Sequence, residues 1–268
     1  MKKILLSLGA LAAVMIALPM FSAFEAHVIN VTATIENALS VPVSEIIFGT
    51  VFPQEHLNKP LGIALSGSFL TENRVDDVEY IIRQKPKCAV TTNGGKTLVG
   101  PTATGHVVVN PETGEVSIDC GPKPRPLAAD GSETWGVLPS LCEYISKHPD
   151  GVDSTAGSTN PNGNDGSLNS FHPPFSVASG TTTVSWLDTK GRLAKSQQDE
   201  VDNWTIDLAV PCFGGYCAQD WENFVHGINP NAVAADYVQD MTNEHKVFGC
   251  DLWVEVTGVS EAVVSLPQ

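Results

Sequence analysis

The six cysteines are the residues of this 268-residue chain whose type and spacing suggest chemistry most directly. They are Cys88, Cys120, Cys142, Cys212, Cys217 and Cys250. An even number of cysteines favours disulfides in an exported protein, and we expect at least two. Cys212 and Cys217 are the predicted pair, because Gly214 and Gly215 between them permit a tight turn. Zinc is disfavoured there by the spacing, and the pairing of the other four cysteines stays open.

A run of Asp and Asn side chains at residues 150–165 is the second candidate group. Its oxygen-bearing members are Asp150, Asp153, Asn162, Asn164 and Asp165, with Asn160 beside them. Such oxygens suit a hard cation, so Ca²⁺ is the one cofactor that the sequence suggests. The run departs from the EF-hand pattern, because its glycine comes one position late and Phe171 replaces the bidentate Glu. An ordinary polar loop is the alternative interpretation.

Motifs that carry enzymatic reactions are absent from the sequence. The seven histidines are scattered singly, and neither an HExxH zinc motif nor a GxSxG nucleophile elbow occurs. We therefore nominate no catalytic residue and expect a protein that is not an enzyme.

The tryptophans offer a different chemistry, because flat aromatic faces can stack on sugar rings. They are Trp135, Trp186, Trp204, Trp221 and Trp253. Trp204 and Trp221 fall within apolar patterns that core packing explains equally well. A carbohydrate-binding module is thus one alternative for the function.

The N-terminus indicates export. Lys2 and Lys3 precede an apolar run at residues 4–18 that Pro19 ends, as in a secretory signal. A run of about 15 residues is short for a transmembrane helix, which needs about 20. Cleavage after Ala23 or Ala26 places a phenylalanine at the −3 position, so residues 1–26 are either a signal peptide or an N-terminal anchor. The sequence predicts a secreted or cell-surface protein.

The net charge of the chain limits the classes of molecule that it is expected to bind. The formal net charge is −15, which repels nucleic acid and anionic membranes. We expect self-association or binding to other cell-surface proteins, with membrane contact only through the N-terminal segment. An apolar content of 42% supports a folded core, and we expect residues 27–268 to form one domain.

Hydrophobic alternation with a period of two predicts a mainly β protein. Apolar residues alternate from Ile29 to Ile35, and further strands are predicted at 44–52, 61–69, 78–82, 202–210 and 250–259. The strand at 78–82 is expected to end at Lys85-Pro86. Such spacing favours a jelly-roll-like antiparallel β-sandwich.

The middle of the chain, residues 86–200, is rich in Pro, Gly, Ser, Thr and Asn, and it is predicted to be a long loop-rich insertion. Within it we expect one hairpin at 106–118 and a short helix at 137–147. A helical stripe predicts another helix at 218–228.

Several sequence blocks resemble a known group of exported proteins. Residues 21–25, Phe-Ser-Ala-Phe-Glu, and residues 48–55, Phe-Gly-Thr-Val-Phe-Pro-Gln-Glu, look like the corresponding parts of the TasA/camelysin group with its SipW-type signal peptides. Blocks at 52–55, 217–221 and 248–253 are also similar to secreted proteins of small-genome bacteria. The resemblance implies a jelly-roll sandwich that can assemble into surface fibres, and it transfers no catalytic residue.

We therefore expect an exported structural or adhesive protein, with a camelysin-like metallopeptidase as a further alternative. If it is a fibre subunit, residues 24–35 are the segment suited to donation, since Ile29, Val31, Ala33 and Ile35 could fill a neighbour's open sheet edge. The alternative is that residues 27–36 form the first strand of their own sandwich.

Overall fold

The structure is a computed structural model that describes residues 33–149 and 166–261. The chain divides into two compact units, residues 1–35 and 36–268, and all strands and helices described below belong to the second unit. The strands pair antiparallel in their sheets, which confirms the mainly β prediction. Within the described ranges no helix is long and apolar enough to cross a bilayer.

The first sheet has four strands in the order β1-β2-β12-β8. Their bounds are Leu39–Ser40 for β1, His56–Leu65 for β2, Val201–Ala209 for β12 and His148–Pro149 for β8. In β12 the predicted alternation is present, because Trp204, Ile206 and Leu208 are buried while their neighbours Asn203 and Thr205 are exposed. This sheet therefore buries one face, as its sequence pattern requires.

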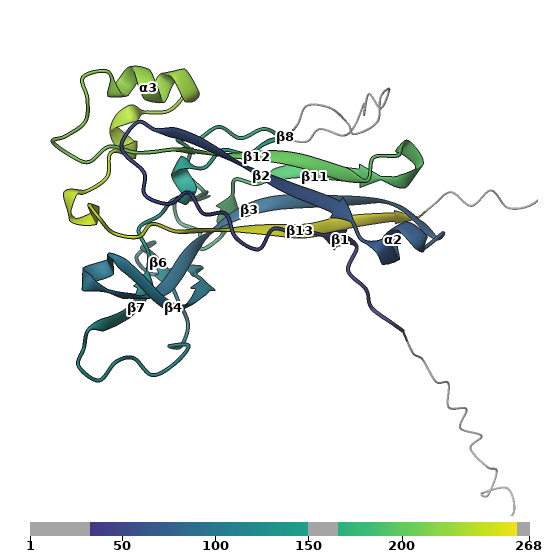
Figure 1. Cartoon of the computed structure of the whole chain (residues 1–268), viewed down its shortest axis with the longest axis horizontal. Coiled ribbons are helices and arrows are strands. Elements are labelled where there is room, and N and C mark those ends of the chain that lie inside the picture. The colour runs from purple at the N-terminus through teal and green to yellow at the C-terminus, as the bar shows by residue number, and fades with distance from the viewer. Residues whose placement is uncertain (1–32, 150–165, 262–268) are drawn as a thin grey trace, which may run out of the picture. The chain divides into compact units, whose positions relative to one another are not determined.

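The second sheet is organised around one long strand, β3, at Val75–Thr92. Its partners are β11 (Thr189–Ala194), β13 (Cys250–Glu261), β4 (Thr97–Thr104) and β7 (Glu133–Val137). The predicted end at Lys85-Pro86 is wrong, because β3 continues through it (Figure 1). Pro86 pairs with Cys250, the first residue of β13, and the pairing of β3 with β4 begins at Lys87. Proline has no backbone N–H, and Pro86 therefore lies at the point where β3 changes from one partner strand to the next.

Two small hairpins complete the strands. One joins β5 (His106–Val109) to β6 (Val116–Asp119), and the other joins β9 (Phe175–Val177) to β10 (Val184–Trp186). The first agrees with the hairpin predicted at 106–118. In its described residues the stretch 86–200 thus contains strands β4 to β11 as well as loops.

Helices are short. They are α2 (Gly67–Thr71), α3 (Trp221–Ile228), and the 3₁₀ turns η2 (Asn93–Gly95), η3 (Cys142–Tyr144), η4 (Lys195–Gln197), η5 (Ala234–Tyr237) and η6 (Met241–Asn243). The helix predicted at 218–228 is present as α3. The helix predicted at 137–147 is wrong apart from η3, because the backbone beyond this turn bonds to β12, with Ser146 N donating to Asp207 O at 2.8 Å.

Three further strand predictions need correction. Residues 44–52 form no strand, since their inward residues, Ile46, Phe48 and Val51, recur irregularly. The strand predicted at 61–69 ends at Leu65, where Ser66 caps α2 by accepting from Phe69 N. Of the strand predicted at 27–36, residues 33–36 lie outside any strand, and residues 27–32 lie outside the described residues.

The hydrophobic core draws on both sheets. Its largest fully buried members include Trp204, Ile63, Ile206 and Leu208 from the first sheet, and Tyr80, Ile82, Val78 and Leu193 from the second. Trp204 Nε1 donates to Tyr80 Oη at 2.8 Å, and Tyr80 Oη bonds to Asp202. The two sheets therefore share one core, while the jelly-roll arrangement stays a prediction.

Candidate functional site

The predicted calcium ligands, Asp150, Asp153, Asn162, Asn164 and Asp165, lie outside the described residues. Within the described ranges no group of three or more His, Cys, Asp or Glu side chains is placed to hold a metal ion.

All six cysteines are paired. Cys212 and Cys217 form the pair that their spacing predicts, with Cα atoms 5.1 Å apart. The other two disulfides, Cys88–Cys120 and Cys142–Cys250, join residues 32 and 108 positions apart, which no local pattern could pair. Cys88 belongs to β3 and Cys120 follows β6, so the first of these bonds attaches the β5–β6 hairpin to the central strand of the second sheet.

The tryptophans divide into two groups. Trp204 and Trp221 are 1% and 6% exposed and belong to the core. Trp135 and Trp186 are half-buried, and Trp253 is 41% exposed. Stacking on a ligand is therefore open only to the second group.

Outward side chains of β3 and β13 form a charged row. Glu255 accepts from Arg83 at 3.0 Å and pairs with Lys85 Nζ at 3.0 Å. Lys85 Nζ lies 3.4 Å from the centroid of the Trp253 ring. Arg83 also donates to both oxygens of Asp188, and this hydrogen bonding raises the pKa of Arg83. This row was not predicted from the sequence. Its signal is a period of two within each strand, since Arg83 and Lys85 alternate along β3 and Trp253 and Glu255 alternate along β13.

A buried polar group lies on the inner side of the sheets. Lys147 is fully buried, and its Nζ has no hydrogen-bond partner in the described part of the chain. Burial lowers the pKa of Lys147 to about 7. His172 Nε2 lies 2.7 Å from Gln84 Oε1, and burial followed by the charge of Lys147 lowers the pKa of His172 to about 4. Lys147 ends a run of buried residues that includes Tyr144, Ile145 and Ser146, so no alternation in the sequence marks it as an inward side chain.

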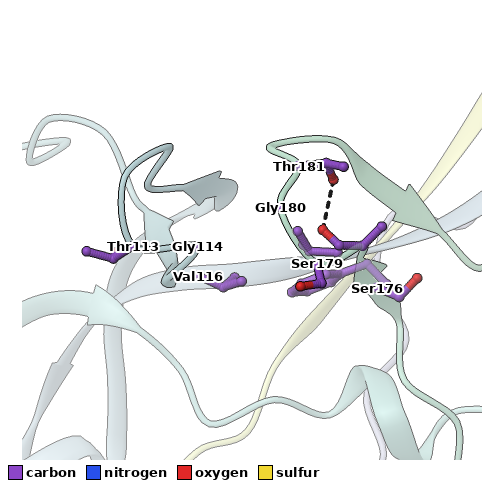
Figure 2. Close-up of a pocket in the computed structure, with 10 residues that line it drawn as sticks. Thr113, Gly114, Val116, Ser176, Ser179, Gly180 and Thr181 are labelled. Carbon is purple, nitrogen blue, oxygen red and sulfur yellow. Dashed lines mark hydrogen bonds between the residues drawn. The ribbon is translucent and has the colours of Figure 1, made fainter.

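An open notch of about 510 Å³ lies between the turns of the two small hairpins (Figure 2). Its lining residues are Thr113, Gly114 and Val116 from the β5–β6 hairpin, and residues 175–181 from β9 and the turn after it. Figure 2 shows Val116 and Ser179 on facing walls of the notch. No lining residue carries an ionisable side chain.

The β5–β6 wall of the notch is held by its own turn. Asn110 Oδ1 accepts from Glu112 N at 2.9 Å, and Gly114 N donates to Asn110 O at 2.8 Å. Gly114 has a φ of +72°, which favours glycine. Together with the Cys88–Cys120 disulfide, these bonds fix the position of this wall relative to β3.

The β9–β10 wall is braced from behind. Phe175 pairs with Trp186 across the two strands, with ring centroids 5.4 Å apart. The guanidinium of Arg83 lies 5.6 Å from the Trp186 ring centroid, which connects this wall to the charged row. At the turn, Thr181 Oγ1 donates to Ala178 O at 3.0 Å (Figure 2). The notch therefore combines an aromatic ring and hydroxyl groups on two walls that internal contacts hold in place.

Comparison with known proteins gives no family for this chain. No family model matches it, and neither curated proteins nor solved structures give a significant match.

Proposed function

We propose that this chain is an exported structural or adhesive protein of the cell surface or extracellular space. The observation that carries the proposal is the pairing of all six cysteines in three disulfides. Disulfides persist in oxidising compartments and are rare in the cytosol. The basic and apolar N-terminal sequence and the net charge of −15 support the same location.

Cell fractionation tests the location. We expect the protein in the medium or the surface fraction, with a new N-terminus after Ala23 or Ala26, and disulfide-linked peptides in an unreduced digest. A reduced protein retained in the cytoplasm would contradict the proposal. If the intact N-terminus is recovered from membranes, residues 1–26 are an anchor, and the surface location still holds.

A fibre built by strand donation is the finer form of this proposal. Within the described residues, β2 pairs with β1 only at Ala64 and Leu65, so the rest of its outer edge pairs with no strand. Unpaired N–H and C=O groups at such an edge can bind a strand from another copy. Pro60 in β2 has no N–H to offer, so a donated strand forms one ladder bond fewer there. Residues 33–36 belong to no strand of their own chain, which supports their use as part of a donor.

Electron microscopy of the mature protein tests the donation. We expect fibres, which a truncation starting at Asn37 abolishes while the truncated chain stays folded. Val31→Asp should also abolish them, whereas Asn30→Asp, on the opposite face of the predicted strand, should preserve them. Unfolding of the truncated monomer would show that the segment belongs to its own fold. Fibres formed by the truncated protein would refute donation.

A further inference from the structure

The notch between the hairpin turns has no charged residue in its lining, although the protein as a whole is strongly acidic. The chain carries 30 Asp and Glu residues and 15 Lys and Arg residues, yet none of them lines the notch. A ligand held there gains little from ion pairing, so its own groups must be neutral.

The lining matches a ligand with an apolar face and many hydroxyls. Phe175 supplies an aromatic ring that can pack against the C–H groups of a sugar face. The Ser179 hydroxyl lies on the side of its wall nearer Val116 and makes no hydrogen bond within the described residues, so it remains available to a ligand, whereas the Ser176 hydroxyl points away from the facing wall (Figure 2). A volume of about 510 Å³ lies in the range of small-ligand sites.

The charges around the notch discriminate further. Glu112 and Glu115 are exposed and belong to the same turn as Thr113 and Gly114. Their carboxylates repel an anionic ligand that approaches this wall. Sialylated or sulfated glycans are therefore disfavoured in comparison with neutral ones.

We propose that the notch binds a neutral saccharide, and that this binding is the adhesive contact of the protein, which rests on the function proposed above. Both walls are held before any ligand arrives, one by the Cys88–Cys120 disulfide and the other by the Phe175–Trp186–Arg83 stack. A preformed site loses less entropy on binding than a flexible loop does.

Glycan binding by the disulfide-bonded protein tests this inference. The probes are cellohexaose, mannohexaose and chitohexaose as neutral saccharides, with a sialylated and a sulfated oligosaccharide as charged comparators, measured by calorimetry and on an array. We expect at least one neutral probe to bind, and the charged probes to bind about tenfold more weakly or not at all.

The variants are matched by chemistry. Ser179→Glu places a charge and extra volume in the notch at an exposed position, and we expect it to weaken binding at least about tenfold. Ser117→Glu makes the same change at an exposed serine outside the lining, and binding should persist. Phe175→Ala should also weaken binding, whereas Phe52→Ala, at a ring 64% exposed and outside the notch, should not.

Each outcome decides the matter. Absence of binding to all neutral probes, preference for the charged probes, or binding that Ser179→Glu leaves unchanged would overturn the inference. If fractionation places the protein at the surface while the neutral probes fail, only the saccharide is wrong. If the protein stays in the cytoplasm, the proposed adhesive function fails whatever the probes bind.

Discussion

Two lysines on opposite sides of the sheets show how environment sets the state of the same side chain. On the outer face, Lys85 Nζ is 3.0 Å from Glu255 and 3.4 Å from the Trp253 ring centroid. On the inner side, Lys147 is fully buried without a hydrogen-bond partner in the described residues, and its pKa falls to about 7. The outer lysine has a carboxylate and an aromatic ring as partners. The inner lysine gives up its charge at a cost to folding, since burial penalises the ammonium form.

The contrast extends to the groups nearby. The outer row is built from side chains that alternate along neighbouring strands, so each charge meets an opposite charge on the next strand. The inner group consists of Lys147, His172 and Gln84, and burial leaves His172 uncharged and Lys147 only partly charged at neutral pH. Changes inside should therefore alter stability by several kcal/mol, and changes outside by much less.

The largest expected effect concerns the tight inner packing. Gly191→Ala places a Cβ about 2.2 Å from Cζ of the buried Tyr80, so the ring has to move out of its bonds to Trp204 and Asp202. We expect a loss of about 4 kcal/mol or more in the free energy of unfolding, measured by chemical denaturation. Gly62→Ala in β2 meets no atom within 4 Å and should change stability by less than about 1 kcal/mol. Equal effects of the two variants would contradict the described packing.

Lys147→Met should stabilise the protein at pH 7 by about 1–4 kcal/mol, because it removes an amine that burial discharges. Between pH 7 and 10.5 the unfolded lysine binds a proton that the folded one does not, so wild-type stability rises with pH in this window. The gain of the variant should therefore shrink toward pH 10.5. Lys190→Met, at an exposed position of β11, serves as the control and should show neither effect.

A third prediction concerns acid. The pKa of His172 is lowered from 6.5 to about 4, so its unfolded form binds a proton first as the pH falls. The stability contributed by neutral His172 is complete above pH 6.5 and is lost as the pH falls toward 4, by about 3 kcal/mol. Denaturation at several pH values in this window measures the slope, which His172→Asn should flatten and His245→Gln, at an exposed histidine, should preserve. In Lys147→Met the slope should weaken, since the nearby positive charge that helps to lower this pKa is gone.

The smallest expected effect belongs to the outer row. Glu255→Gln removes the carboxylate that both Arg83 and Lys85 contact, at a side chain 29% exposed. We expect a loss of about 1 kcal/mol or less, which should diminish further in about 1 M salt. A loss as large as that of Gly191→Ala, insensitive to salt, would remove the distinction between the two faces.

Local patterns predicted the elements in which one face is buried along the whole length. The alternation of Trp204, Ile206 and Leu208 predicted β12, and the stripe at 218–228 predicted α3. Alternation failed where a segment packs without pairing, as at residues 44–52, because apolar content alone does not distinguish a strand from a packed loop. The predicted strand end at Lys85-Pro86 was wrong because a proline interrupts a strand only where a neighbouring strand requires a backbone N–H at that position.

The sequence by itself determined the mainly β class and the Cys212–Cys217 pair, whose closure depends on only the few residues between them. The tertiary structure decided the Cys88–Cys120 and Cys142–Cys250 pairs, the burial of Lys147, and the notch between residues 113–116 and 175–181. The physical reason is the range of the interactions. Periodicity and turn residues act between near neighbours in the chain, whereas these contacts arise only when the packing of both sheets brings distant segments together.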